Sequence, residues 1–188
     1  MHNILKIFVV FWAALSLTGC APSLHPFFTD EDVVFNKALL GVWIGDSDKK
    51  CLFTRSGDNH YELLYVEDES ARFEAQLIEL GGATFLDLYP KPPGKGNGLY
   101  SVNFVPAHTL ARVTIGEDSI SIAMMNGDWL KQLSDRNQLD LAHERLDDEI
   151  VALTAPTREL RAFALKHADS KEAFCEAEVF HRLRSDKR

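Results

Sequence analysis

The sequence has none of the short motifs that carry a familiar enzymatic chemistry or hold a metal ion. There is no C-x-x-C pair, no two histidines have the H-x-x-x-H spacing, and no G-x-S-x-G turn presents a nucleophilic serine. The one histidine beside a carboxylate, in His143–Glu144, lies in a highly charged stretch that is typical of a solvated surface. We therefore expect that the protein is not an enzyme and carries no cofactor and no metal.

Basic residues and cysteines are scarce. Lys and Arg number 20 against 28 Asp and Glu, which gives a formal net charge of −8. Nucleic acid is not expected as a partner, because binding to a phosphate backbone requires clustered Lys and Arg. Of the three cysteines, Cys51 and Cys175 are a candidate disulfide in an oxidising compartment. Two buried thiols are the alternative, and the sequence alone leaves both open.

The apolar run at the N-terminus is not long enough to cross a membrane. Ile7–Leu17 is uncharged and follows Lys6, and small residues come next at Thr18 and Gly19. A bilayer-spanning helix needs roughly 20 apolar residues, more than this run supplies. Residues 1–19 are therefore predicted to be a secretory signal peptide that is removed from the mature chain.

The end of this signal resembles the lipobox of bacterial lipoproteins. The residues that carry the resemblance are Leu17, Thr18, Gly19 and Cys20. The resemblance implies that the first three are recognised by the processing enzymes and that Cys20 is lipidated, with palmitate or similar chains. Two or three acyl chains hold a protein to a membrane, whereas one chain does so only marginally. Because Ala21 stands where an Asp tends to retain such proteins in the inner membrane, the resemblance implies the outer membrane, with the domain facing the periplasm.

The chain after the signal is predicted to form one domain close to the membrane. Residues 20–28 contain two prolines and are expected to be a short lipidated tether. Apolar residues make up 46% of the chain, which is ordinary for a globular protein. We find neither an internal repeat nor a second core, so residues 29–188 are predicted to be a single β-rich domain. The acidic body gives no attraction to an anionic bilayer, which leaves the lipid as the predicted attachment.

From Gly41 onward, the hydrophobic pattern has a period of two. Ala71, Phe73, Ala75 and Leu77 share one face of a strand, for example, and polar residues share the other. Short turns between consecutive strands favour an antiparallel meander that closes into a barrel or half-barrel. The fold class is therefore mainly β (α+β), with flanking N-terminal and C-terminal helices. The predicted strands are residues 42–45, 50–55, 60–67, 71–80, 83–89, 108–115 and 119–125, with short ones at 149–153 and within 173–183; the predicted helices are residues 29–40, 126–135 and 154–167, and residues 90–98 are a loop.

The start of the first strand resembles the G-x-W signature of lipocalins and the wider calycins. Gly41 and Trp43 carry the match, directly after a predicted short helix. The resemblance implies an up-and-down barrel whose closed end is plugged by Trp43 and whose open end takes an apolar ligand. It also implies a late-strand arginine packed on the tryptophan, for which Arg182 and Arg184 are the candidates.

Asp87 is the carboxylate of most interest, because it lies within the apolar strand Phe85–Tyr89. It is either on the exposed face or buried and paired. A buried acid with a perturbed pKa would be a candidate functional residue. A structural pair with His108 or Arg112 on a nearby strand is the alternative that we favour.

Two functional hypotheses follow from these patterns. The first is a membrane-anchored lipoprotein whose barrel binds a small apolar ligand or a lipid. The second is a structural or assembly lipoprotein that binds another envelope protein and no ligand. An apolar cavity of about 300 Å³ or more would favour the first, and a filled barrel with an exposed apolar patch would favour the second. The chain also resembles uncharacterised small bacterial lipoproteins that share the segments at 85–90 and 128–130, a likeness that implies no known activity.

Overall fold

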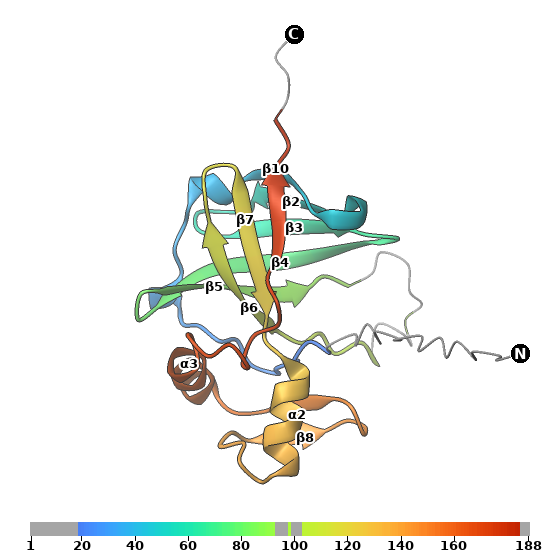
Figure 1. The fold of residues 1–188 in the computed structure, drawn as a ribbon, viewed down its shortest axis with the longest axis vertical. Helices are drawn as coiled ribbons and strands as arrows, with labels where there is room; N and C mark the ends of the chain where they lie inside the picture. The colour runs from blue at the N-terminus through green and yellow to red at the C-terminus, as the bar shows by residue number, and fades with distance from the viewer. Residues whose placement is uncertain (1–18, 93–97, 99–102, 185–188) are drawn as a thin grey trace, which may run out of the picture.

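The computed structural model describes residues 19–92, 98 and 103–184, which form a barrel, a small hairpin and two helices (Figure 1). The barrel strands are β1 (Gly41–Ile44), β2 (Lys50–Arg55), β3 (Tyr61–Val66), β4 (Ser70–Leu80), β5 (Ala83–Pro90), β6 (Thr109–Ile115), β7 (Ser119–Met124) and β10 (Glu178–Arg182). The other elements are the helices α2 (Gly127–Asp135) and α3 (Thr157–Lys166), the hairpin strands β8 (His143–Arg145) and β9 (Val151–Leu153), and the 3-10 turns η1 (Asp30–Asp32), η2 (Lys37–Leu39) and η3 (Asp46–Asp48).

Eight strands of the described chain close into an antiparallel barrel in the order β1-β10-β7-β6-β5-β4-β3-β2. From β1 to β7, strands that follow each other in sequence are neighbours, as predicted for a meander. β10 completes the barrel by pairing with both β7 and β1. Between β7 and β10 the chain forms α2, the β8–β9 hairpin and α3, which lie below the barrel in Figure 1. The predicted mainly β meander is thus confirmed, as a closed barrel and not a half-barrel.

Two hydrophobic cores share the wall of this barrel, although the sequence predicts one. The inner core includes the inward-facing residues Leu77 and Leu86. The outer core lies between the outside of the sheet and the N-terminal segment, α2, β9 and α3. It forms because outward-facing positions such as Ile78, Phe85 and Leu110 are apolar as well, so these strands are buried on both faces. The helices below the barrel therefore belong to the same packed body as the sheet.

Two glycines make the tight turn between β4 and β5 that the sequence predicts. Gly81 and Gly82 have φ values of 56° and 85°, in the left-handed region that glycine adopts without strain. A Cβ atom on Gly81 would lie 2.4 Å from the side chain of Leu165 on α3. The hairpin tip is thus shaped both by its own turn and by close contact with this helix.

The predicted helix at residues 29–40 is wrong. The chain there forms two separate 3-10 turns, η1 and η2, with an extended stretch at residues 33–36 between them. Val33 bridges strand β4, and the backbone N–H of Val34 donates to the carbonyl oxygen of Leu77 at 2.9 Å. The β-branched side chains of both valines favour extended backbone. Pairing with the sheet therefore takes the place of the predicted helix.

The two predicted C-terminal helices are present. α2 follows Asn126, whose side-chain oxygen accepts a hydrogen bond from the backbone N–H of Trp129 at 3.2 Å. α3 begins at Thr157, later than predicted, because Pro156 and not Thr154 occupies the N-cap position. The sequence does not predict β8, since its three residues are all polar and show no alternation.

Residues 20–28 are packed into the folded domain, although the sequence predicts a tether. Ala21, Ser23 and Phe27 are buried. The backbones of Ser23 and His108 exchange two hydrogen bonds of 2.8 Å, so this segment pairs with the rest of the domain as a strand would. The position of Cys20 relative to the barrel is therefore fixed by the fold.

Asp32 joins η1 to α3. Its carboxylate accepts hydrogen bonds from the backbone N–H and the hydroxyl of Thr29, at 2.7 and 2.9 Å, and from the guanidinium of Arg161. Burial by itself raises the pKa of Asp32, but these donors together outweigh burial and hold the pKa below its ordinary value. The ionised carboxylate therefore stabilises the fold above the unfolded-state pKa of about 3.9, and this stabilisation is lost as the pH falls through the lower folded-state pKa.

Replacing Asp32 with asparagine is expected to make the unfolding free energy depend less on pH in acid solution. At neutral pH the Asp32→Asn variant should lose about 1–3 kcal/mol of unfolding free energy, because charge-assisted hydrogen bonds to the buried Asp32 carboxylate are lost. Below about pH 4 the wild type should lose stability more steeply than the variant. Urea unfolding measured between pH 7 and about pH 3 tests this, with the exposed Asp169→Asn as the matched control. If the unfolding free energy of the wild type and of Asp32→Asn fell equally with pH, the stabilising role of the Asp32 carboxylate would be contradicted.

Candidate functional site

The barrel is filled at one end and hollow at the other. A cavity of about 340 Å³ occupies the hollow half. This volume lies at the lower end of the range of roughly 300–1,000 Å³ that small-molecule sites have. Most of its lining is apolar and comes from alternate, inward-facing strand positions: Cys51, Leu63, Phe73, Leu86, Leu88, Ile122, Met124 and Phe180, joined by Tyr65, Thr109, Glu178 and Cys20.

Some inward-facing side chains near the mouth are only half-buried. Tyr65, Phe73, Ile122 and Met124 pack against the inner core, yet each keeps part of its surface accessible. Apolar side chains at inward positions of a small barrel are normally covered by their neighbours. Their exposure follows from the cavity, which is therefore open to molecules from outside.

Charged residues lie at the rim of this apolar cavity. The ammonium of Lys49 lies 3.1 Å from the carboxylate of Glu178 and 3.4 Å from that of Glu67. The hydrogen bond to Glu178 is the main reason why the pKa of Lys49 is raised. An apolar interior with a few polar groups at one edge is suited to an amphipathic guest, since those groups fix the orientation of its polar end.

Cys20 lines the mouth of the cavity. It forms an isolated antiparallel bridge with Asn126, and the N–H of Gly127 donates to the carbonyl of Gly19 at 2.9 Å. A Cβ atom on residue 127 would lie 2.1 Å from that carbonyl oxygen, so the approach requires a glycine there. Cys20 is exposed at this mouth, and partial desolvation by the surrounding atoms, followed by the nearby Cys175, raises the pKa of its thiol. Of the lipobox-like residues, Leu17 and Thr18 lie outside the described part of the chain.

Cys51 and Cys175, both described, are not bonded to each other. Cys51 points into the cavity from β2, and burial raises the pKa of its thiol to about 12. Cys175 lies between α3 and β10 and lines a hollow on the outer surface of β6 and β7. Its backbone N–H donates to the carbonyl of Met124 at 2.8 Å. The two cysteines thus face opposite sides of the barrel wall, and the candidate disulfide is not formed.

The filled end of the barrel is organised around Trp43. The side chain is completely buried, and its indole N–H donates to the carbonyl of Leu39 in η2 at 2.9 Å. The guanidinium carbon of Arg182 lies 4.0 Å from the centroid of the indole, a cation–π distance. Trp43 therefore occupies the position of a plug, and Arg182 is the one of the two candidate arginines that packs on it.

Arg182 also connects β10 to the 3-10 turn η2. Its guanidinium donates to the carbonyls of Leu40 and Ala38, at 2.9 and 2.5 Å. Gly41 has a φ of 123°, and a Cβ atom there would lie 3.0 Å from the Arg182 guanidinium. Arg184 instead forms an exposed ion pair with Asp118. The glycine of the G-x-W pattern is thus explained by its backbone conformation and by close contact with Arg182.

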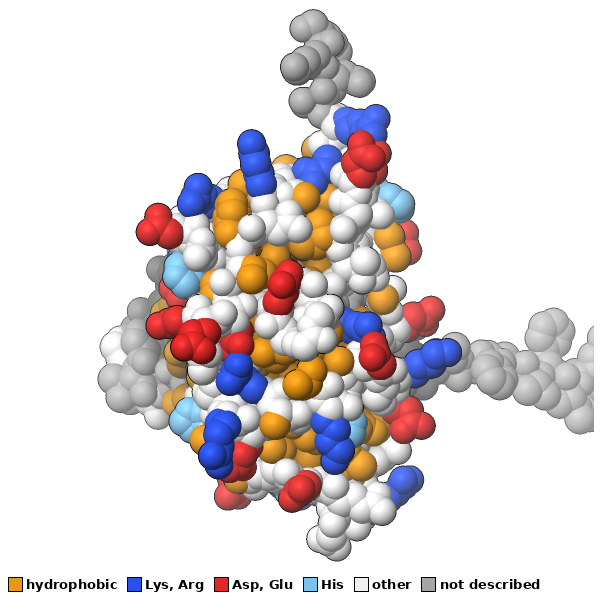
Figure 2. Space-filling model, turned by 90° about the vertical axis from the view of Figure 1, so that its left-hand side faces the viewer, with side chains coloured by type: hydrophobic (Ala, Val, Ile, Leu, Met, Phe, Trp, Pro, Cys, Tyr) orange, Lys and Arg blue, Asp and Glu red, His pale blue; other side chains and the backbone are white. Residues whose placement is uncertain are grey.

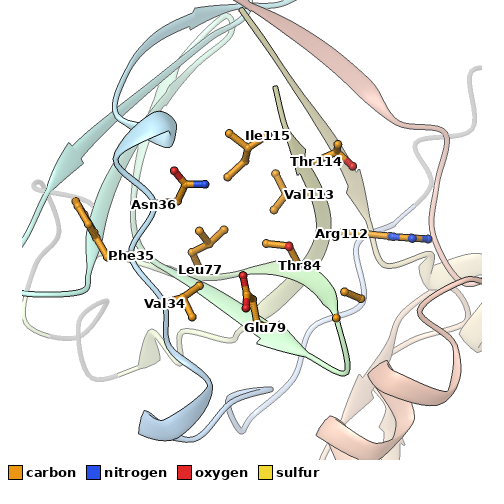
Figure 3. A pocket seen from close by; sticks show the side chains of 12 residues that line it. Val34, Phe35, Asn36, Leu77, Glu79, Thr84, Arg112, Val113, Thr114 and Ile115 are labelled. Atoms are coloured by element: carbon orange, nitrogen blue, oxygen red, sulfur yellow. The ribbon is translucent and has the colours of Figure 1, made fainter. Parts of the chain in front are cut away.

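A second hollow, of about 440 Å³, opens on the side of the barrel (Figure 3). It forms because the pairing of β5 with β6 ends at Phe85 and Arg112, beyond which the two strands separate. Leu77, Val113 and Ile115 point into this hollow, while Arg112 points away from it (Figure 3). Figure 2 shows the side of the molecule on which the β4–β5 hairpin turns, where hydrophobic side chains are exposed among charged ones. More of the exposed lining is polar here than in the barrel cavity.

Asp87 is buried on the outer face of β5, away from the cavity. Its carboxylate lies 2.7 Å from Nδ1 of His108 and accepts a hydrogen bond from the backbone N–H of Phe27 at 3.1 Å. The His108 ring also packs at a tilt against the ring of Tyr89, with centroids 4.5 Å apart. These contacts hold the N-terminal segment on the sheet, so Asp87 has the structural role of a paired acid.

Ser134 and His143 form a pair that the sequence does not signal. The Ser134 hydroxyl lies 2.9 Å from Nε2 of His143, and Nδ1 of His143 lies 2.7 Å from the carbonyl oxygen of Leu141. A proton on Nδ1 leaves Nε2 free to accept the hydroxyl proton. The group that orients the His143 ring is a backbone carbonyl, whereas in a catalytic triad it is a carboxylate. The pair connects the end of α2 to β8.

Neither a metal site nor a membrane-spanning helix is found in the described part of the chain. No three His, Cys, Asp or Glu side chains there converge in a group that could hold a metal ion. No helix there has both the length and the apolar character needed to cross a bilayer. Comparison with known proteins gives no relative, because no protein-family model, no curated protein and no solved structure matches the chain.

Proposed function

We propose that the protein is an envelope lipoprotein, anchored through lipid on Cys20, whose barrel binds a small apolar ligand or a lipid. The observation that carries the proposal is the apolar cavity of about 340 Å³ inside the barrel. It exceeds the volume at which a barrel interior becomes a candidate ligand site. Membrane attachment and a location at the periplasmic side of the outer membrane rest on the lipobox-like sequence and on Ala21 after the cysteine.

The likeness to lipocalins supports the same proposal. The meander of eight strands, the plug formed by Trp43, and the stacking of Arg182 on its ring agree with what that likeness implies. The cavity, moreover, lies in the half of the barrel that Trp43 does not fill. A lipocalin-like barrel binds its ligand in the open half, and this is the binding mode that we propose.

An assembly lipoprotein without a ligand is the second candidate. The observation that favours it is a pair of exposed apolar residues at the tip of the β8–β9 hairpin, Leu146 and Ile150, which are 65% and 39% exposed. The N–H of Leu146 donates to the carbonyl of Ile150 at 3.0 Å, so the two side chains are held at one turn. Two residues make a small patch, and we therefore rank this candidate below ligand binding.

Replacing Cys20 with serine is expected to abolish lipid labelling and membrane attachment. The thiol is the proposed acceptor of the lipid, and the acidic body offers no other attraction to an anionic bilayer. Growth with radioactive palmitate followed by membrane fractionation measures both effects. Cys175→Ser is the matched control and should label and fractionate like the wild type. Persistent membrane association of Cys20→Ser would contradict the anchor.

The ligand proposal is tested with the soluble Cys20→Ser protein. A fluorescent fatty acid should bind it saturably, at one probe per barrel, with the blue-shifted emission of an apolar site. Absence of any shift, together with absence of co-extracted lipid, would contradict ligand binding and leave the anchor proposal standing.

A further inference from the structure

The position of Cys20 determines which apolar chain can reach the barrel cavity. Cys20 is itself part of the cavity lining. The polypeptide after Cys20 is held in place, since Ala21 and Ser23 are buried and Cys20 bridges Asn126. Any group attached to the Cys20 sulfur therefore starts at the mouth of the cavity.

We propose that the cavity holds one acyl chain of the protein's own lipid, so that the anchor and a free apolar ligand compete for one site. This inference rests on the lipidation of Cys20 in the proposed function. It adds that the occupant in the absence of ligand is a part of the molecule itself, and that membrane attachment and ligand binding are coupled.

The chemistry of the cavity matches such an occupant. Leu63, Leu86 and Ile122 line it with hydrocarbon, while Glu178 and Thr109 supply the polar groups. An acyl chain leaves water equally well by entering a bilayer or an apolar protein cavity, because the hydrophobic effect scales with the area removed from water. The bilayer and the barrel are thus two alternative places for the same chain.

Because the acyl chain is attached at the cavity mouth, it has an advantage over any free ligand that competes for the cavity. A ligand joined by a short flexible link has an effective concentration in the millimolar range at its site. A free fatty acid must displace this tethered chain, and so should bind the lipidated protein more weakly than the unlipidated one.

The coupling works in both directions. A chain that lies in the barrel is withdrawn from the bilayer, and membrane attachment weakens as fewer chains remain inserted. A free ligand that fills the cavity returns the chain to the bilayer and strengthens attachment. Reciprocity of this kind is a thermodynamic necessity when two events compete for one site.

The proposal is tested by photocrosslinking of the intact lipoprotein in membranes. Cells are grown with a palmitate analogue that carries a diazirine near the chain end and a terminal alkyne, and the membranes are irradiated. Mass spectrometry of the purified protein should find the Cys20-linked chain joined to inward-facing residues of β5 and β7 in the same molecule, such as Leu88 and Ile122.

Two cavity-filling variants control the experiment. Ile122→Trp and the milder Ile122→Phe should each reduce these intramolecular crosslinks at least about tenfold, because the introduced aromatic ring is larger than the isoleucine side chain and occupies the space of the acyl chain. Val179→Trp, on the exposed outer face of β10, should leave them unchanged. Crosslinks that persist in both filled variants would show that the chain lies elsewhere and would overturn the proposal.

Each failure identifies the claim that is wrong. If Cys20 carries no label, both the anchor and this inference fail. If Cys20 is labelled but its chain crosslinks only to phospholipid or other proteins, this inference alone fails, and binding of a fluorescent fatty acid by Cys20→Ser remains a separate measurement. Equal affinity of the lipidated and Cys20→Ser proteins for that probe would also overturn the proposal, since a tethered competitor predicts at least about a tenfold difference.

Discussion

Replacing Ile122 with tryptophan is expected to weaken binding of a fluorescent fatty acid to the soluble Cys20→Ser protein at least about tenfold, which is about 1.4 kcal/mol. Ile122 points inward from β7 and remains half-buried at the cavity wall. An indole ring at this position would occupy the space that the ligand needs. Fluorescence titration of the variant and the parent protein measures the effect.

Stability and binding must be separated in this experiment. Enlarging a side chain in a packed core costs about 1–3 kcal/mol, but the cavity leaves room for part of the ring and lowers that cost. Val179→Trp places the same side chain on the exposed outer face of the barrel and should bind the probe like the parent. A folded Ile122→Trp protein with unchanged affinity would show that the probe binds outside the barrel.

Replacing Trp43 with alanine should produce the largest loss of stability, about 3–5 kcal/mol of unfolding free energy. The side chain is completely buried, donates a hydrogen bond to Leu39, and lies under the Arg182 guanidinium. Its removal leaves a cavity and leaves the cation without its aromatic partner. Urea unfolding followed by circular dichroism measures the change.

The two neighbouring arginines provide a matched pair of controls. Arg182→Ala should also destabilise, because it contacts the indole and the carbonyls of Ala38 and Leu40. Arg184→Ala should change stability by less than about 1 kcal/mol, since its ion pair with Asp118 is exposed. A double-mutant cycle between Trp43 and Arg182 should show a coupling of about 0.5–2 kcal/mol. Independent effects of the two substitutions would contradict the proposed plug.

The strands of the barrel could be predicted because their pattern is local. Residues of β4 such as Phe73 and Ala75 alternate with polar neighbours, and the Gly81-Gly82 turn fixes where the hairpin reverses. Closure could not be predicted in the same way. It depends on the pairing of β10 with β1, in which Arg182 lies opposite Trp43 although most of the sequence separates the two residues.

The N-terminal region shows why the remaining predictions failed. Val33 and Val34 lie within the helix predicted at residues 29–40, yet β4 offers them a backbone pairing that the sequence pattern cannot show. The proline-containing stretch after Cys20 is likewise packed into the domain and is not a tether, because the backbone of Ser23 pairs with that of His108.

The candidate site was predictable in part. The G-x-W pattern indicated Trp43 as a plug, and inward alternation identified residues that line the cavity. Two features depended on tertiary contacts that no local pattern reveals. One is the placement of Cys20 at the cavity mouth, through its bridge to Asn126, and the other is the ion pair of Lys49 with Glu178 at the rim.

The central claim is that the barrel is a ligand-binding site, and native mass spectrometry of the purified Cys20→Ser protein tests it most directly. The protein should carry one noncovalent adduct of the mass of a single lipid or fatty acid, added from solution or retained from the cell, and Ile122→Trp should lose it while Val179→Trp keeps it. Bare protein under all these conditions, with no adduct at saturating fatty acid, would contradict the claim.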